Sequence, residues 1–151
     1  MKEQDEDFMR LALVEAQAAG SRGEVPIGAV LVSAEGQVLA RDGNHIVATH
    51  DPTAHAEMLV LRAAAAQLGN ERLVGTTLYV SLEPCAMCAG AMSLARVARL
   101  VYAAADPKGG AIEHGPRFFT QATCHHRPAV ERAGDSEAAG RLLKDFFQAR
   151  R

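Results

Sequence analysis

The spacing of apolar residues predicts four helices. Within residues 7–19 the apolar positions recur every three or four residues, which is the period of a helix with one buried face. The last segment, residues 135–151, shows the same period. Between these segments we expect a helix over residues 54–67, capped by Thr53, and another over residues 84–94, with Pro84 as its first residue.

Runs of β-branched, aromatic and leucine residues predict the strands. These runs are residues 27–32, 38–40, 76–82 and 99–104. The first two flank a short turn at residues 34–36, so we expect an antiparallel hairpin. Helices separate the later strands, so we expect those strands to be parallel. Residues 42–52 are interpreted as a loop, and residues 105–134 show no clear period. The alternation as a whole indicates an α/β layered fold.

Composition restricts the classes of protein that fit. A chain of 151 residues is long enough for one core, so we expect a single domain over residues 1–151. Its 16 Lys and Arg against 18 Asp and Glu argue against coating nucleic acid through bulk charge, although a local basic face stays open. Three cysteines are too few for a secreted disulfide framework. No apolar run approaches the roughly 18 residues of a membrane span, and the acidic N-terminus is unlike a targeting peptide. We therefore expect a cytoplasmic protein without a membrane partner.

Two short motifs carry the candidate chemistry, each at the start of a predicted helix. The first places His55 two residues before Glu57, and the second is the segment 84–88, which contains Cys85 and Cys88. Cysteines three apart in a first helical turn face the same way, and a helix N-terminus favours their thiolate forms. Structural zinc normally takes four protein ligands, whereas catalytic zinc keeps a position for water. Three ligands and a spare carboxylate therefore indicate a catalytic Zn²⁺ site.

The chemistry expected of such a site is hydrolysis. Zinc lowers the pKa of a bound water to about 7, and Glu57 is placed to take its proton and pass it on. The order H-x-E followed by P-C-x-x-C, with 26 residues between Glu57 and Pro84, is the signature of zinc-dependent nucleobase deaminases.

Other interpretations of the same residues stay open. A CxxC pair alone also occurs in redox and structural sites. A structural zinc module could be completed by Cys124, His125 or His126, although adjacent polar residues in an irregular region are more often not ligands. A third alternative is a zinc-stabilised RNA-binding module without catalysis, which would not need Glu57.

The chain resembles the bacterial tRNA-specific adenosine deaminases of the cytidine deaminase-like superfamily over nearly its whole length. The matching stretches are EVPIGAVLV at 24–32, DPTAHAE at 51–57, LYVSLEPCAMCAGAM at 78–92, DPKGG at 106–110 and LLKDFF at 142–147. The resemblance implies a three-layer α/β/α domain with a mixed five-stranded sheet, a homodimer with one Zn²⁺ per subunit, and conversion of the wobble adenosine of a tRNA anticodon loop to inosine.

The resemblance also implies residue roles. His55, Cys85 and Cys88 would hold zinc, and Glu57 would shuttle the proton. Asn44 falls where the family has an asparagine that touches the target nucleotide. Asp106 and Lys108 fall where the family has residues that contact the anticodon loop.

The substrate is less firmly indicated than the chemistry. Because one fold serves many substrates, a deaminase of a free base or nucleoside, such as guanine or cytosine, stays an alternative. Phe146 and Phe147 precede Arg150 and Arg151, a mixture that could stack a base and meet phosphates. We expect Phe146 to be a core residue and keep Phe147 as a candidate substrate contact. The small apolar segment 89–92 is expected to form part of a dimer contact.

Overall fold

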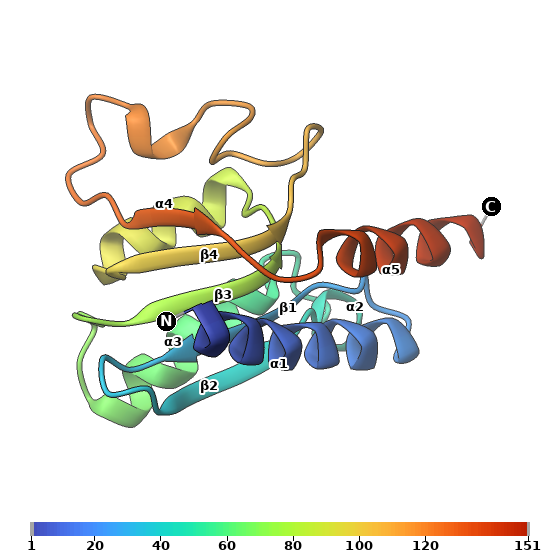
Figure 1. The fold of residues 1–151 in the computed structure, drawn as a ribbon, viewed down its shortest axis with the longest axis horizontal. Helices are drawn as coiled ribbons and strands as arrows, with labels where there is room; N and C mark the ends of the chain where they lie inside the picture. The colour runs from blue at the N-terminus through green and yellow to red at the C-terminus, as the bar shows by residue number, and fades with distance from the viewer. Residues whose placement is uncertain (1, 151) are drawn as a thin grey trace.

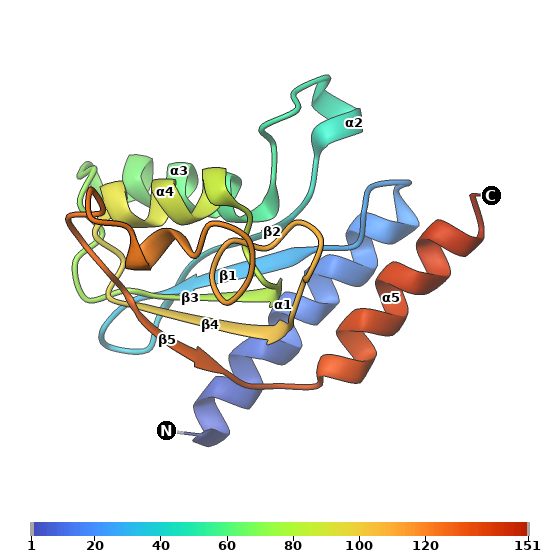
Figure 2. The same cartoon turned by 90° about the horizontal axis from the view of Figure 1, so that it is seen from above.

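The computed structural model describes residues 2–150, which form a sheet between two layers of helices (Figures 1 and 2). In chain order the elements are α1 (Lys2–Ser21), β1 (Gly28–Val32), β2 (Val38–Gly43), α2 (Ile46–Thr49), α3 (Ala56–Leu68), β3 (Thr77–Leu82), α4 (Ala86–Ala95), β4 (Arg99–Ala104), the 3₁₀ turn η1 (Phe118–Thr120), β5 (Ala129–Arg132) and α5 (Ser136–Gln148). Figure 2 shows α3 and α4 on one face of the sheet and α1 and α5 on the other. The predicted α/β/α layering is confirmed.

The sheet has five strands in the order β2-β1-β3-β4-β5. β1 pairs antiparallel with β2 and with β3, whereas β3, β4 and β5 run parallel. The predicted hairpin, the parallel later strands and the mixed five-stranded sheet are therefore confirmed. Leu82 pairs with Ala104, so β3 and β4 end side by side at one end of the sheet. The segments that follow these two strands consequently start from the same place.

Helix α1 lies unusually close to the β1-β2 hairpin. Its residues Ala12 and Ala16 are completely buried, as the spacing of apolar positions predicts. Gly28 of β1 pairs with Gly43 of β2. A Cβ atom at Gly28 would lie 2.0 Å from the carbonyl oxygen of Ala12, and one at Gly43 would lie 2.6 Å from that of Glu15. Only glycine at both positions permits this approach of the helix backbone to the sheet.

The helix starts differ from those predicted. His55, not Thr53, is the N-cap of α3, because the Thr53 hydroxyl donates to the Asp51 carboxylate instead of capping the helix. Cys85, not Pro84, immediately precedes α4. The first candidate ligand of each motif, His55 or Cys85, therefore lies one residue before its helix, in extended backbone.

Two segments that gave no pattern contain regular structure. The predicted loop 42–52 includes the end of β2 and the short helix α2. The irregular region contains η1 and the edge strand β5, whose four residues are all exposed and so carry no hydrophobic alternation. Among residues 2–150, no helix combines the length and the apolar character that crossing a membrane requires.

Helix α5 confirms the predicted C-terminal helix but corrects one core residue. Asp135 caps the helix by accepting a hydrogen bond from the Ala138 amide at 2.9 Å. Phe146 is half-buried and not in the core, and the Arg150 guanidinium lies 3.4 Å above its ring. The reason is visible in Figure 1, where the end of α5 extends past the sheet. Arg151 lies outside the described residues.

Candidate active site

The ends of two helices bring the metal-type side chains together. α3 and α4 lie side by side on the same face of the sheet (Figure 2). His55 is the N-cap of α3 and Cys85 is the N-cap of α4, each in extended backbone, while Cys88 lies in the first turn of α4. The unpaired amides at a helix N-terminus carry partial positive charge, which favours thiolates there.

The three side chains have the separations that a zinc ion needs. The Nδ1 atom of His55 lies 3.7 Å from the Cys85 sulfur and 3.6 Å from the Cys88 sulfur. One ligand atom from each residue lies within 4.8 Å of the others. Zinc–sulfur distances near 2.3 Å and zinc–nitrogen distances near 2.0–2.1 Å at a tetrahedral angle put sulfur and nitrogen about 3.6 Å apart. The donor set and its spacing therefore fit zinc.

The protonation of this group also suits metal binding. The hydrogen bond from Cys88 and the neighbouring His55 outweigh burial and lower the pKa of the Cys85 thiol to about 4. The same interaction with Cys85, together with burial, raises the pKa of Cys88. The hydrogen bond to Cys85 raises the pKa of His55. The Cys85 thiolate thus lies between two groups that share protons with it, and a bound zinc ion would displace those protons.

Glu57 is a buried carboxyl group beside the three metal-type side chains. It lies in the first turn of α3 and only 4% of it is exposed. Burial raises the pKa of Glu57 to about 7. A carboxyl group with a pKa near neutrality can both hold and release a proton at working pH, which is the property of a general acid and base.

Asn44 lies against the start of α3. It is 2% exposed, and its side-chain Oδ1 accepts a hydrogen bond from the Ala56 amide at 2.8 Å. Arg22 donates to the Asn44 carbonyl oxygen at 3.0 Å. The structure therefore brings Asn44 next to the segment that carries His55 and Glu57.

Two buried glutamates hold loops near the site, and neither was singled out from the sequence. Glu24 accepts hydrogen bonds from the amides of Val47 and Ala48 and so holds α2. Glu83, directly before Pro84, accepts hydrogen bonds from the loop that follows β4, residues 105–117. Burial alone would raise the pKa of Glu83, but hydrogen bonds from Asp106, His114 and Ile112 lower it to about 2. In the sequence each is only a charged residue close to a buried strand. The residues that donate hydrogen bonds to them lie 23 to 31 positions away, so the sequence alone does not indicate these contacts.

The other predicted site residues are spread over two elements. Asp106 and Lys108 lie in the loop that follows β4, where Lys108 is exposed. Phe147 lies near the end of α5 and is 50% exposed. Figures 1 and 2 place α2, this loop and the end of α5 at the same end of the sheet, where β3 and β4 finish.

Cys124 and His126 are separate from the metal-type group. The Cys124 sulfur lies 3.5 Å from the Ser93 hydroxyl and 3.2 Å from the carbonyl oxygen of His126. The His126 ring lies 2.6 Å from the Val97 carbonyl oxygen. These contacts give both side chains partners within the fold, whereas the metal-type group consists of His55, Cys85 and Cys88.

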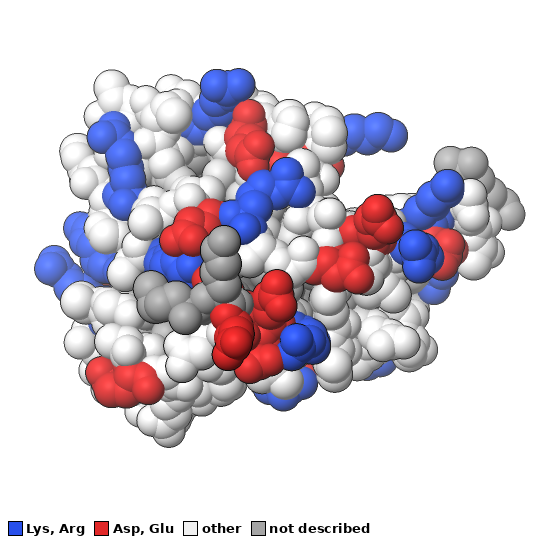
Figure 3. Space-filling model, viewed as in Figure 1, with Lys and Arg blue, Asp and Glu red and all other residues white. Residues whose placement is uncertain are grey.

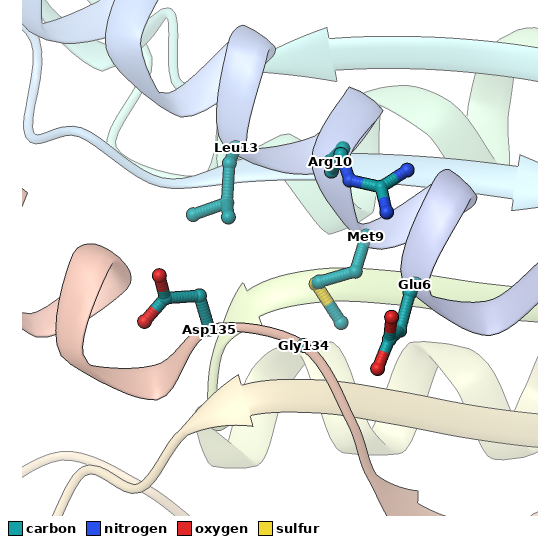
Figure 4. Close-up of a pocket in the computed structure, with 6 residues that line it drawn as sticks. All are labelled: Glu6, Met9, Arg10, Leu13, Gly134 and Asp135. Carbon is teal, nitrogen blue, oxygen red and sulfur yellow. The ribbon is translucent and has the colours of Figure 1, made fainter. Parts of the chain in front are cut away.

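A cavity between α1 and the turn before α5 lies away from the metal-type group. It has a volume of about 280 Å³. Figure 4 shows the residues that line it, which are Glu6, Met9, Arg10, Leu13, Gly134 and Asp135. It contains no histidine or cysteine and no member of the metal-type group. The candidate active site is therefore the one at the N-termini of α3 and α4, not this cavity.

Comparisons with known proteins agree with this assignment. The family described as the cytidine and deoxycytidylate deaminase zinc-binding region matches residues 2–104, which include all three candidate ligands. A tRNA-specific adenosine deaminase of Agrobacterium fabrum is 56% identical over 144 residues, covering 95% of this chain and 94% of that protein. A solved structure from studies of A-to-I editing by tRNA:A34 deaminases is also 56% identical, with a TM-score of 0.84, and covers 93% of this chain and 98% of its own.

A more distant structure is a guanine deaminase from Bacillus subtilis. It is 39% identical with a TM-score of 0.63, and the match covers 66% of this chain and 64% of that one. The zinc-type site, the α/β/α fold and the near-complete match to the Agrobacterium protein point to one conclusion. This chain belongs to the zinc-dependent cytidine and deoxycytidylate deaminase family and, within it, to the tRNA-specific adenosine deaminases.

Proposed function

We propose that this protein hydrolyses the wobble adenosine of a tRNA anticodon loop to inosine, with release of ammonia. The observation that carries the chemistry is the convergence of His55, Cys85 and Cys88 beside the buried Glu57. The substrate is supported by the relative from Agrobacterium, which is named a tRNA-specific adenosine deaminase.

In this proposal His55, Cys85 and Cys88 hold one zinc ion. Zinc, when bound, lowers the pKa of a coordinated water to about 7 and so supplies a nucleophile near neutral pH. The Glu57 carboxylate accepts a proton from the attacking water and donates it to the purine, so that the bond from C6 to the water oxygen forms and the amino group leaves C6 as ammonia. Its burial, which raises its pKa to about 7, supports this exchange.

The adenosine is held by residues around the end of the sheet. We assign contact with the target nucleotide to Asn44, whose position beside Ala56 supports this role. Asp106 and Lys108 are assigned to the anticodon stem-loop, and the exposed Phe147 to stacking on a base. An adenine must leave its stack to reach a buried site, and a single-stranded loop opens at lower cost than a duplex.

Recognition by shape fits the charge of the molecule. Figure 3 draws the face covered by α1 and α5, which is opposite the face that carries α3 and α4, and acidic and basic side chains are interspersed over it. The formal net charge of the whole chain is −2. Because bulk attraction to RNA is weak at this charge, the proposal places specificity in the fit of the loop.

We further propose that the protein is a single domain and acts as a homodimer in the cytoplasm. Helix α4 supports a dimer contact, since its Leu94 is 78% exposed beside a cavity of about 230 Å³ that includes Gly90 and Phe118. Sedimentation at micromolar concentration tests the dimer, and a monomer would contradict it.

The alternative substrate is a free base or nucleoside, and the guanine deaminase among the structural relatives is the observation that favours it. The test is to incubate the zinc-loaded protein separately with an anticodon stem-loop, guanine, cytosine and free adenosine, and to measure ammonia. We expect release from the stem-loop at least about 100-fold faster than from the others. Faster release from a free base would overturn the proposed substrate.

A further inference from the structure

We infer that Glu83 is a positioning residue for RNA binding, which fixes the loop of residues 105–117 against the zinc-ligand turn and so sets where Asp106 and Lys108 meet the anticodon loop. This inference rests on the proposed function.

The backbone places Glu83 at the start of this loop. Its amide donates to the carbonyl oxygen of Ala104, the last residue of β4, at 2.8 Å. Its side chain is completely buried. It also precedes the metal ligand Cys85 by two residues. The Glu83 side chain therefore connects the loop to the segment that carries the zinc ligands.

The Glu83 carboxylate accepts five hydrogen bonds from the loop. Oε1 accepts from the Asp106 amide at 3.0 Å and from Nδ1 of His114 at 2.8 Å. Oε2 accepts from the amides of Ile112, Glu113 and His114 at 3.0, 2.9 and 3.1 Å. Three consecutive amides pointing at one oxygen form the type of concave site that binds anions. Here the anion is supplied by the chain itself.

The loop is closed tightly around this carboxylate. A Cβ atom at Gly110 would lie 2.5 Å from the Glu83 carboxylate and 2.5 Å from the Asp106 carbonyl oxygen. The Ala111 amide donates to the carbonyl oxygen of Pro84 at 2.8 Å, which is a second tether to the zinc-ligand turn. A side chain at position 110 would therefore clash both with the carboxylate and with the backbone of the loop.

Hydrogen bonds continue from Glu83 to Lys108. The Asp106 amide is bound by Glu83, and the Asp106 carboxylate accepts from the amides of Lys108 and Gly109 at 3.1 and 3.0 Å. Hydrogen bonds therefore hold both the backbone and the side chain of Asp106, and they also hold the backbone of the exposed Lys108. Loss of the Glu83 contact should move both residues while leaving the metal ligands in place.

The test compares Glu83→Gln with the wild-type enzyme. The glutamine side chain keeps one oxygen that accepts hydrogen bonds, but its NH₂ group faces some of the five donors of the loop. Part of the hydrogen bonding between residue 83 and the loop is therefore lost. We expect stoichiometric zinc, a KM for the anticodon stem-loop raised about tenfold, a kcat within about threefold, and faster hydrogen exchange at the Asp106 amide. Adding Lys108→Ala to Glu83→Gln should raise KM by less than the product of the single effects, because both act through one loop.

The control is Asp5→Asn, which alters a buried carboxylate paired with Arg99 at the opposite end of β4. It should lower stability without changing KM. If Glu83→Gln does not yield folded protein, His114→Ala removes one donor to Oε1 and should accelerate Asp106 exchange to a smaller degree. Unchanged exchange and unchanged KM in the folded variant, or equal loss in the control, would overturn the positioning role. Absence of inosine formation by the wild-type protein would instead overturn the proposed function. Hydrogen exchange at the Asp106 amide would then still show whether Glu83 holds the loop.

Discussion

Glu57 and the three proposed metal ligands lie in one site, but they are assigned different roles. His55, Cys85 and Cys88 present one nitrogen and two sulfurs at the separations suited to zinc. Glu57 is not needed for that geometry, yet it is buried beside the ligands. Burying a carboxyl group costs free energy unless hydrogen bonds or ion pairs offset it, and the metal geometry does not require this one. Metal binding and catalysis should therefore be separable by substitution.

Glu57→Ala should keep zinc and abolish deamination. The three ligands remain, whereas the proton transfer that general acid–base catalysis supplies is lost, so ammonia release should fall by at least about 100-fold. Zinc is measured by atomic absorption and ammonia by a coupled assay. Glu35→Ala, at an exposed turn residue, is the matched control and should leave both unchanged. Deamination retained by Glu57→Ala would instead favour a module that only binds RNA.

Cys124→Ser should retain stoichiometric zinc, whereas Cys85→Ser should lose it. Cys124 contacts Ser93 and the His126 carbonyl oxygen and not the metal-type group. Both variants replace one sulfur by oxygen, so they are matched in chemistry. Loss of zinc from Cys124→Ser at equal folded content would contradict the three-ligand assignment.

At the scale of elements, local patterns predicted what local interactions determine. The helical period of α1, the hairpin of β1 and β2, and the strands β3 and β4 were all predicted and observed. Helix α2 was missed because its amides are satisfied by Glu24, more than twenty residues earlier. Strand β5 was missed because all four of its residues are exposed, so its pairing with β4 leaves no mark on the sequence.

The site shows the same division between local and distant interactions. His55, Glu57, Cys85 and Cys88 were predicted because each motif is complete within a few residues. The role of Glu83 was not, since its partners lie in a segment without a regular period and become neighbours only when β3 and β4 pair. Phe146 was predicted wrongly to be core because helical period shows which face is apolar but not where the neighbouring layer ends.

Asp5 joins α1 to the sheet and should contribute stability that depends on pH. Its carboxylate accepts hydrogen bonds from Arg99 at 2.8 and 2.6 Å and from the Tyr79 hydroxyl at 2.6 Å. The Arg99 hydrogen bonds outweigh burial and lower the pKa of Asp5 below its usual 3.8. A carboxyl group with a lowered pKa stabilises the fold above the unfolded value, and this stability is lost as pH falls through the folded value.

Asp5→Asn should lower the free energy of unfolding by about 2 kcal/mol at pH 7, measured by urea denaturation, since hydrogen bonds to a charged group are lost. The difference from wild type should shrink as pH falls below about 4, and it should vanish below the lowered pKa of Asp5, where the wild-type carboxyl group is also neutral. Asp7→Asn on the same helix is the control, because its ion pair with Arg10 is exposed and should contribute little. A difference that does not change with pH would contradict the ionic role of Asp5.

At the scale of the whole molecule, the site, the loop that follows β4 and the end of α5 lie at one end of the sheet (Figures 1 and 2). The formal net charge of −2 gives little general attraction to RNA, so binding must depend on a fitted local surface. A protein built in this way should discriminate between adenosines of one loop by position. By contrast, a deaminase that accepts any adenosine within reach of its site would convert all adenosines of the loop to a similar degree.

The proposed activity can be tested by locating inosine in an anticodon stem-loop that carries adenosine at the wobble position and at a second loop position. After incubation with zinc-loaded protein, the RNA is digested and each position is read by mass spectrometry. We expect inosine at the wobble position, at least about 100-fold above the second position, and none with Glu57→Ala. Inosine at both positions in similar amounts, or at neither, would contradict wobble-specific deamination by this protein.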